Sequence, residues 1–142
     1  PWHENIGKRQ VKAPRIYFAD TGLLHAALGI GDVRALGTHP RLGASWEGFA
    51  VGEIMALPRL RDAEWYFWRT HTGAELDLLA VQGRQRTGFE IKRAISPGLT
   101  PSMRSALSDL KLDRLFVVHA GPETYPLGER VSAIPLGRLR LS

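Results

Sequence analysis

Hydrophobic residues near the middle of the chain recur at the spacing of a helix. Between residues 42 and 57 the apolar positions recur at helical spacing, at Trp46, Phe49, Ala50, Ile54 and Leu57. This period predicts an amphipathic helix with one buried face. Pro58 follows directly, and the residue before a proline disfavours helical backbone, so we expect the helix to end there.

Three segments that follow this helix are typical of strands. Residues 64–70, 74–81 and 86–94 are rich in aromatic and branched apolar residues. The turn-like sequences HTGA and QGRQ separate them. Strands joined by such short turns pair antiparallel, so we predict a three-strand meander.

The second half of the chain adds a helix and one or two strands. Ser-Pro-Gly at residues 96–98 breaks the strand pattern, and Thr100 followed by Pro101 is typical of a helix start. Residues 113–120 indicate a buried strand. Residues 131–136 suggest an edge strand, because Pro135 has no N–H to donate to a sheet. The order helix, three strands, helix, strand predicts a mixed α/β fold.

The first forty residues read as an addition to this core. Residues 1–14 are polar and suggest a tail or the end of a preceding element. A short strand at 15–20 and a helix at 21–29 predict an N-terminal strand–helix extension over 15–40, before a core domain at 41–142. The chain begins at Pro1 rather than at Met, so we expect a fragment of a longer protein.

Composition narrows the class of protein. The 142 residues are 44% hydrophobic and 23% charged, which suits one globular domain. No apolar run approaches the roughly 20 residues of a membrane span, and no secretory signal precedes the core. The sequence has no cysteine, which excludes disulfides and cysteine-ligated zinc and fits a cytoplasmic location. A net charge of +5 favours nucleic acid as a partner, although an ordinary solubilising surface is the alternative.

Charged residues in the predicted meander are the candidates for chemistry. In the third strand, Glu90 and Lys92 share one face by the period-two rule. In the second strand the same rule places Leu76 and Leu78 on one face and Asp77 on the other. Asp77 interrupts an apolar run, and a buried carboxylate is costly unless it is paired or binds a metal. Because a meander makes these strands neighbours, we expect Asp77, Glu90 and Lys92 to converge on one side of the sheet.

This set of residues suits a metal-dependent phosphodiester hydrolase. Asp77 and Glu90 would be oxygen ligands for Mg²⁺ or Mn²⁺, which polarise phosphate and activate water. Lys92 would position the water or balance charge on the phosphate. A helix carboxylate, Glu47 or alternatively Glu53, would complete the site. The alternative is an ordinary cross-strand ion pair with a satisfied buried aspartate.

Other polar residues carry weaker signals. Arg69, at the end of the first strand, and Arg93, next to Lys92, are candidate nucleic-acid contacts. His25, His39 and His119 lack the spacing of metal ligands, so we interpret each as structural or solvent-exposed.

The combination resembles a nuclease superfamily. Gly43-Ala-Ser-Trp-Glu47, then Asp77, then Glu90-Ile-Lys92 resembles the PD-(D/E)XK motif of restriction-endonuclease-like proteins. Asp77 lacks the proline that nominally precedes it in that motif. The resemblance implies a restriction-endonuclease-like core, with Glu47, Asp77 and Glu90 at the metal and Lys92 as a catalytic residue.

A longer series of segments is similar to a family of ATPase-linked domains. RIYFADTGLL, WEGFAVGEI, YFWRTHTGAELDLLA and GFEIKRA resemble the C-terminal domain of unknown function 4143 of bacterial and archaeal AAA-type ATPases. The resemblance implies a preceding ATPase domain that is missing from this chain. The P-loop pattern Gly-x-x-x-x-Gly-Lys-Ser/Thr is absent, so we expect no ATP site of that kind.

Two functional hypotheses follow. The first is a Mg²⁺- or Mn²⁺-dependent nuclease-like domain acting on DNA and attached to an AAA-type ATPase. The second is a non-catalytic nuclease-fold module that binds nucleic acid or protein within the ATPase. A purely structural α/β domain would instead scatter these charges, so the placement of Asp77 relative to Glu90 separates it from the other two.

Overall fold

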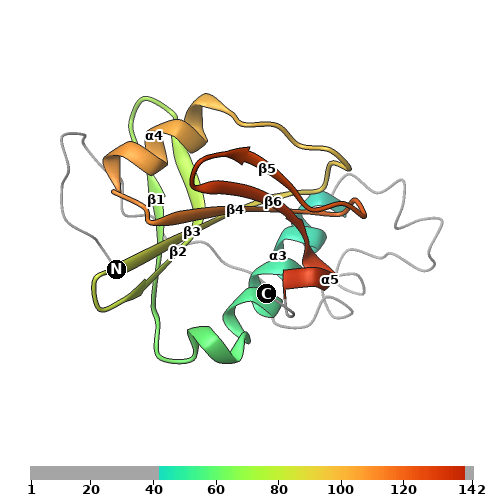
Figure 1. Ribbon diagram of the computed structural model, residues 1–142, viewed down its shortest axis with the longest axis horizontal. Helices are drawn as coiled ribbons and strands as arrows, with labels where there is room; N and C mark the ends of the chain where they lie inside the picture. Colours follow the sequence, from blue (N-terminus) through green and yellow to red (C-terminus); the bar gives the residue numbers. More distant parts are fainter. Residues whose placement is uncertain (1–41, 140–142) are drawn as a thin grey trace.

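The computed structural model describes residues 42–139, with side chains from Trp46 onward (Figure 1). The predicted tail at 1–14 and strand–helix extension at 15–40 lie outside these residues. The elements, in chain order, are α3 (Leu42–Met55), the 3-10 helix η1 (Pro58–Leu60), β1 (Glu64–Arg69), β2 (Glu75–Gln82), β3 (Gln85–Lys92), α4 (Pro101–Asp109), β4 (Arg114–His119), β5 (Tyr125–Gly128), β6 (Val131–Pro135) and α5 (Leu136–Leu139). This confirms the mixed α/β class.

One six-stranded sheet organises these elements, in the order β1-β2-β3-β4-β6-β5. β1, β2 and β3 pair antiparallel, which confirms the predicted meander. β4 pairs parallel with both β3 and β6, and β5 closes the sheet antiparallel to β6. The parallel pairing of β3 and β4 needs a crossover, and α4 provides it.

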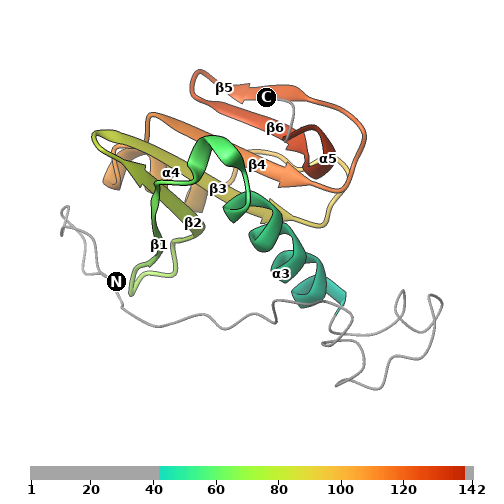
Figure 2. The same ribbon diagram turned by 90° about the horizontal axis from the view of Figure 1, so that it is seen from below.

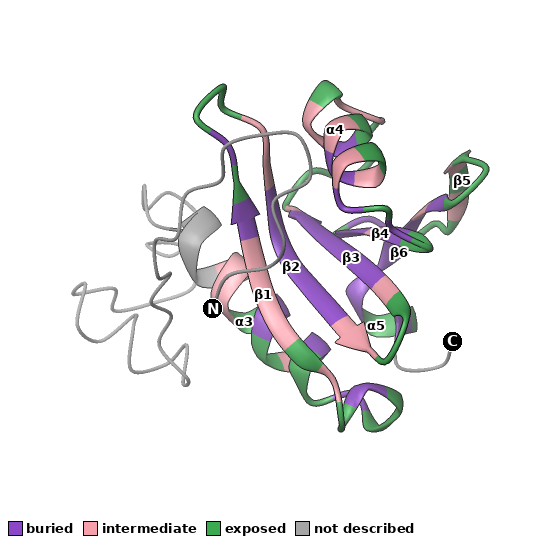
Figure 3. Cartoon of the chain, turned by 90° about the vertical axis from the view of Figure 1, so that its left-hand side faces the viewer, coloured by how far each residue is buried: buried purple, intermediate pink, exposed green. Residues whose placement is uncertain are grey.

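Helices cover both faces of the sheet. α4 lies on one face, and α3 and α5 lie on the other (Figures 1 and 2). Two hydrophobic cores result. The α3-side core includes Ile54, Phe89 and Val118, and the α4-side core includes Met103, Leu115 and Val117. Because both faces are covered, the middle of β2 and β3 is buried throughout (Figure 3).

The start of α4 follows from its sequence. Thr100 is the N-cap, and its Oγ1 accepts a hydrogen bond from the Met103 N–H at 3.3 Å. Pro101 occupies the first turn, where its missing N–H is not needed. The predicted helix start is therefore confirmed.

The prediction of an edge strand at 131–136 was wrong. β6 lies between β4 and β5, and β5 forms the edge. The sequence pattern of β5 (YPLG) is too short and too rich in turn-forming residues to indicate a strand. Pro135 is tolerated because β5 pairs with β6 only from Ala133 back to Val131, so no donor is required at Pro135 on that side.

A bulge in β2 overturns the simple period-two assignment of its faces. Tyr66 pairs with Leu79 and Trp68 pairs with Leu76, so two steps along β1 correspond to three along β2. The extra residue reverses the alternation. Leu76 consequently packs in the α4-side core, whereas Leu78 packs in the α3-side core. The prediction that Leu76 and Leu78 share a face was wrong for this reason.

The loops that follow β3 and β4 touch each other at the carboxyl ends of these strands. A Cβ on Gly121 would collide with the backbone carbonyl oxygen of Ile95. Tyr125 Oη also donates to the Pro97 carbonyl at 2.7 Å, which fixes the same loop against β5. Glycine at 121 is therefore required by the close approach of two backbones.

We expect Gly121→Ala to lower the free energy of unfolding by about 1–3 kcal/mol, because the added methyl must displace backbone rather than a flexible side chain. Urea denaturation measures the loss. Gly52→Ala is the matched control, since nothing lies within 4 Å of its added Cβ and alanine favours the helix. Equal stability of the two variants would contradict the close packing of these loops.

Candidate functional site

The candidate site lies where β2 and β3 stop pairing. Their register runs from Gln82 opposite Gln85 to Leu78 opposite Phe89. Beyond that point Asp77, which is only 6% exposed, takes over as the acceptor: its Oδ2 receives the Ile91 N–H at 2.8 Å. A side-chain carboxylate therefore replaces a backbone carbonyl at the place where the ladder opens.

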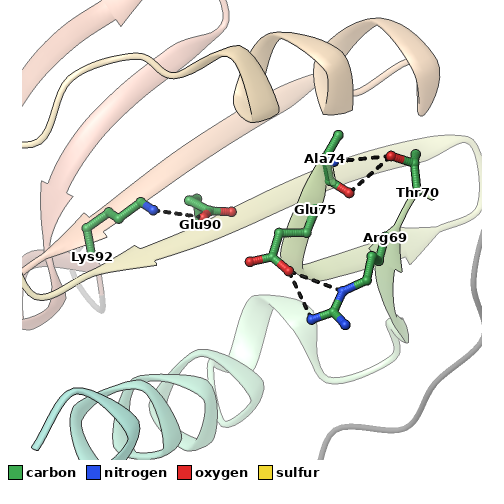
Figure 4. Close-up of polar contacts among 6 residues, drawn as sticks. All are labelled: Arg69, Thr70, Ala74, Glu75, Glu90 and Lys92. Carbon is green, nitrogen blue, oxygen red and sulfur yellow. Dashed lines mark hydrogen bonds and ion pairs between the residues drawn. The ribbon is translucent and has the colours of Figure 1, made fainter. Parts of the chain in front are cut away.

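Glu90 is buried beside this opening, on the α4 side of the sheet. Its strand neighbours Phe89 and Ile91 belong to the α3-side core, and its β4 partner Val117 belongs to the α4-side core. Glu90 is 5% exposed, and its Oε1 lies 3.3 Å from the Lys92 Nζ (Figure 4). Among residues 42–139, no hydrogen-bond partner meets its Oε2. The site thus contains a buried carboxylate oxygen with unused acceptor capacity.

The electrostatics of Glu90 show that the two carboxyl groups interact. The pKa of Glu90 is raised from its ordinary value of 4.5 to about 7, mainly by burial and next by the negative charge of Asp77. Lys92 acts in the opposite direction through its charge and its hydrogen bond. The structure therefore brings Asp77, Glu90 and Lys92 together, as the sequence pattern predicts.

Arg69 and Glu75 form an ion pair on the opposite side of the sheet. Nε and Nη2 of Arg69 both donate to Glu75 Oε2, at 3.3 and 3.1 Å (Figure 4). Arg93 is exposed and directly follows Lys92. Roles for Arg69 and Arg93 in nucleic-acid contact stay predictions.

The two candidate helix carboxylates point in different directions from α3. Glu47 precedes the buried residues Val51 and Ile54 by four and seven positions, so it lies on the stripe of α3 that packs against the sheet. Glu53 instead shares a stripe with Trp46 and Phe49. α3 covers the face of the sheet opposite to Glu90, so a role of Glu47 or Glu53 in a metal site stays a prediction.

Asp77 and Glu90 are the carboxylates that could hold a divalent cation. Within the described part of the chain, no three histidine, aspartate or glutamate side chains converge as a ready-made metal site. Mg²⁺ commonly takes only one or two protein carboxylates and fills its remaining positions with water and substrate phosphate. The partnerless Oε2 of Glu90 beside Asp77 fits that mode of binding.

A cavity of about 400 Å³ lies beside α3, and the sequence pattern did not predict it. Its walls come from α3, the end of β4 and the β6–α5 junction: Trp46, Phe49, Glu53, His119, Ala120, Gly121, Pro135, Leu136 and Gly137. His119, interpreted from the sequence as structural or solvent-exposed, is fully buried, and its Nδ1 accepts the Gly121 N–H at 3.0 Å. Residues so far apart in the sequence carry no local signal of a shared cavity.

Comparison with known proteins places the chain in a family. The family described as "Domain of unknown function (DUF4143)" matches residues 42–139. The chain belongs to this family. A second family, "Domain of unknown function (DUF8612)", matches residues 1–34. The match to the first family covers the whole sheet and both flanking layers of helices.

Two mycobacterial relatives are similar along nearly the whole chain. They are "Uncharacterized protein Rv2008c" of Mycobacterium tuberculosis and "Uncharacterized protein Mb2031c" of Mycobacterium bovis, each 50% identical over 139 residues. The alignment covers 98% of this chain but 31% of each relative, so the chain spans about a third of their length. No solved structure matches the chain. Within residues 42–139, no helix is long and apolar enough to cross a membrane.

The raised pKa of Glu90 makes stability depend on pH. Folded Glu90 binds its proton more tightly than unfolded Glu90, so the free energy of unfolding is highest below pH 4.5 and falls as pH rises to about 7. We expect this group to remove up to about 3 kcal/mol over that range. Urea denaturation at several pH values, with a chelator present, measures the loss.

Two substitutions separate the causes of this pH dependence. Glu90→Gln should remove the loss attributed to Glu90. Asp77→Asn keeps an acceptor for the Ile91 N–H but removes a negative charge, so it should reduce the loss and shift it to lower pH. An unchanged pH profile in both variants would contradict the buried, interacting pair.

Proposed function

We propose that this domain is a Mg²⁺- or Mn²⁺-dependent nuclease that hydrolyses DNA phosphodiesters at Asp77, Glu90 and Lys92. The observation that carries the proposal is the pair of buried, electrostatically coupled carboxyl groups at the opening of the β2–β3 ladder, with a lysine 3.3 Å from one of them. Buried charges with perturbed pKa values are common at functional sites.

Asp77 and Glu90 would hold the metal, and Glu47 would be the third carboxylate. A bound divalent cation supplies Lewis-acid activation of the phosphodiester and of water. Glu90 is suited to act as a metal ligand. Burial makes its charged form unfavourable in free energy unless a cation lies nearby. The protein contributes by fixing Asp77 through the Ile91 N–H and Glu90 through Lys92.

Lys92 would act on the substrate side of the site. Its side chain is 40% exposed while Glu90 is buried, so the ammonium group lies between the protein interior and solvent. An ammonium group has three donors. One can stay with Glu90 Oε1 while another holds the attacking water or a phosphate oxygen. Lys92 would thereby position the water and balance the charge that develops on the phosphate.

Two further features support action on a nucleic acid. The net charge of +5 favours a polyanion, and exposed Arg93 lies next to Lys92. The succession helix, three strands, helix, strand, observed as α3 to β4, is compatible with the proposed restriction-endonuclease-like core. The relatives are about three times as long as this chain, and the additional length is enough for the proposed AAA-type ATPase domain. We propose that the whole protein acts in the cytoplasm.

The second candidate is a non-catalytic module that binds nucleic acid or protein within the ATPase. The Glu90–Lys92 ion pair at 3.3 Å favours it, because it satisfies one oxygen of Glu90 without a metal. In that case Glu90 and Lys92 would serve only as a buried ion pair, and binding would depend on salt but not on a divalent cation.

Cleavage assays with Mg²⁺ or Mn²⁺ on single-stranded, duplex and branched DNA test the proposal. Asp77→Asn, Glu90→Gln and Lys92→Met change the charge at the site with little change in shape. We expect each to reduce cleavage by about 100-fold or more, as loss of one charge-stabilising group does in other enzymes.

Glu129→Gln is the matched control, because Glu129 is exposed in the turn between β5 and β6. It should cleave like the unmodified protein. Cleavage that survives all three site substitutions would point to a contaminating nuclease. Salt-sensitive binding without metal-dependent cleavage would favour the non-catalytic module.

A further inference from the structure

The segment that follows β3 carries the most exposed large apolar side chain among residues 42–139. Ile95 is 69% exposed, whereas Phe49 is 44% and Met55 is 43% exposed. Ile95 takes part in neither of the two hydrophobic cores described above, so its side chain does not serve the packing of this fold. Single exposed apolar residues are ordinary on protein surfaces. The surroundings of Ile95 therefore decide whether it has a function.

The backbone around Ile95 is held in place by its neighbours. The Ile95 carbonyl lies so close to Gly121 that no side chain fits at that glycine. Two residues further along, the Pro97 carbonyl accepts a hydrogen bond from Tyr125 Oη at 2.7 Å. The loop from β3 to α4 therefore runs past β5 on a fixed path (Figure 1). A side chain on such a loop is presented to a partner with little ordering cost.

This loop lies on the same face of the sheet as the candidate site. Tyr125, which holds Pro97, packs against the α4-side core. Glu90 is buried on that face, and its partner Lys92 is the last residue of β3. Three residues of chain span at most about 11 Å, so the Cα atom of Ile95 lies within that distance of the Cα atom of Lys92. The exposed apolar side chain is therefore a neighbour of the lysine that the proposed reaction uses.

Two cations precede this apolar side chain. Lys92 is 40% exposed, and Arg93 is exposed as well. Residues 93–100 contain no acidic residue that would offset this charge. A polyanion is attracted to such a surface. Nucleic acid offers phosphates to the cations and apolar contact with its bases to an isoleucine, so this combination of side chains favours nucleic acid as the partner.

We propose that Ile95 is an apolar wedge that separates two stacked bases of duplex DNA, while Arg93 contacts a neighbouring phosphate. The proposal rests on the proposed nuclease function and names its substrate class: duplex DNA that can be unstacked beside the phosphate to be cleaved. Proteins that kink DNA insert isoleucine and similar side chains between base steps in this way. Phosphate contacts beside such a wedge fix the position of the protein on the duplex.

A wedge makes the deformability of the DNA matter. Pyrimidine–purine steps such as TA unstack easily, whereas A-tracts are stiff. Contacts with phosphates alone do not distinguish between them. The domain should therefore prefer duplexes that contain a flexible step, even though it makes no hydrogen bond that reads the bases.

Binding measured without catalysis tests the wedge independently of cleavage. The full 142-residue chain is titrated, in excess chelator, into short duplexes that differ only in the central step, TA or part of an A-tract. Each carries 2-aminopurine, an adenine analogue whose fluorescence rises when it is unstacked, at that step. We expect the fluorescence of the TA duplex to rise on binding, and its affinity to be about fivefold higher than that of the A-tract duplex.

Three variants separate the wedge from the charge. Ile95→Ala should abolish the fluorescence rise and the preference for the TA duplex, but it should leave the salt dependence of binding unchanged. Arg93→Gln should weaken binding of both duplexes equally and reduce the salt slope by about 1, while the fluorescence rise at saturation stays. Met55→Ala is the matched control, because Met55 is an exposed apolar residue of α3, on the other face of the sheet, and its loss should change nothing.

Circular dichroism and urea denaturation establish that each variant folds. An unchanged fluorescence rise in folded Ile95→Ala would overturn the proposal, as would equal affinity of the unmodified chain for the two duplexes. Binding of polyglutamate as tight as that of DNA, with no fluorescence rise, would overturn it in favour of an acidic protein partner. Because no metal is present, unstacking that depends on Ile95 without cleavage in the metal assay would reject the nuclease function and keep the wedge. Cleavage without such unstacking would reject the wedge alone.

Discussion

The hydrogen bond from the Ile91 N–H to the Asp77 carboxylate determines the geometry of the candidate site. It stands where the β2–β3 ladder ends, so that β2 and β3 can separate without leaving a buried donor unpaired. The bulge in β2 lies at the same place and supplies the extra residue. The Asp77 carboxylate, which pairs the last backbone donor of this ladder, is thereby placed next to Glu90.

This arrangement explains why the charged form of Glu90 is unfavourable in free energy and why it suits a bound cation. The covering layers of α3 and α4 bury the centre of β3, and Glu90 is buried with it next to a second carboxylate. Lys92 offsets only part of the cost, because its own side chain extends toward solvent. A cation at this point would relieve the repulsion, as the proposed metal-dependent function requires.

Local patterns in the sequence predicted the features that depend on local interactions. The cap at Thr100, the three-strand meander and the alternation of Phe89 with Glu90 follow from neighbouring residues alone. The bulge in β2 depends on the register of its partner strand, so Leu76 and Leu78 could not be assigned correctly. The position of β6 depended on β5, which has no strand-like pattern. The cavity joins α3 to the ends of β4 and β6, and no spacing in the sequence predicts such a contact.

The most direct test of the coupled carboxylates is a titration of Glu90 itself. Carbon-13 NMR of the side-chain carboxyl groups, with Glu90 assigned through Glu90→Gln, would be recorded from pH 4 to 9, first with a chelator and then with Mg²⁺. The account predicts a pKa of about 7 for Glu90 in the chelator, and a shift to lower pH when Mg²⁺ is added. An ordinary pKa near 4.5 that does not respond to Mg²⁺ would contradict it.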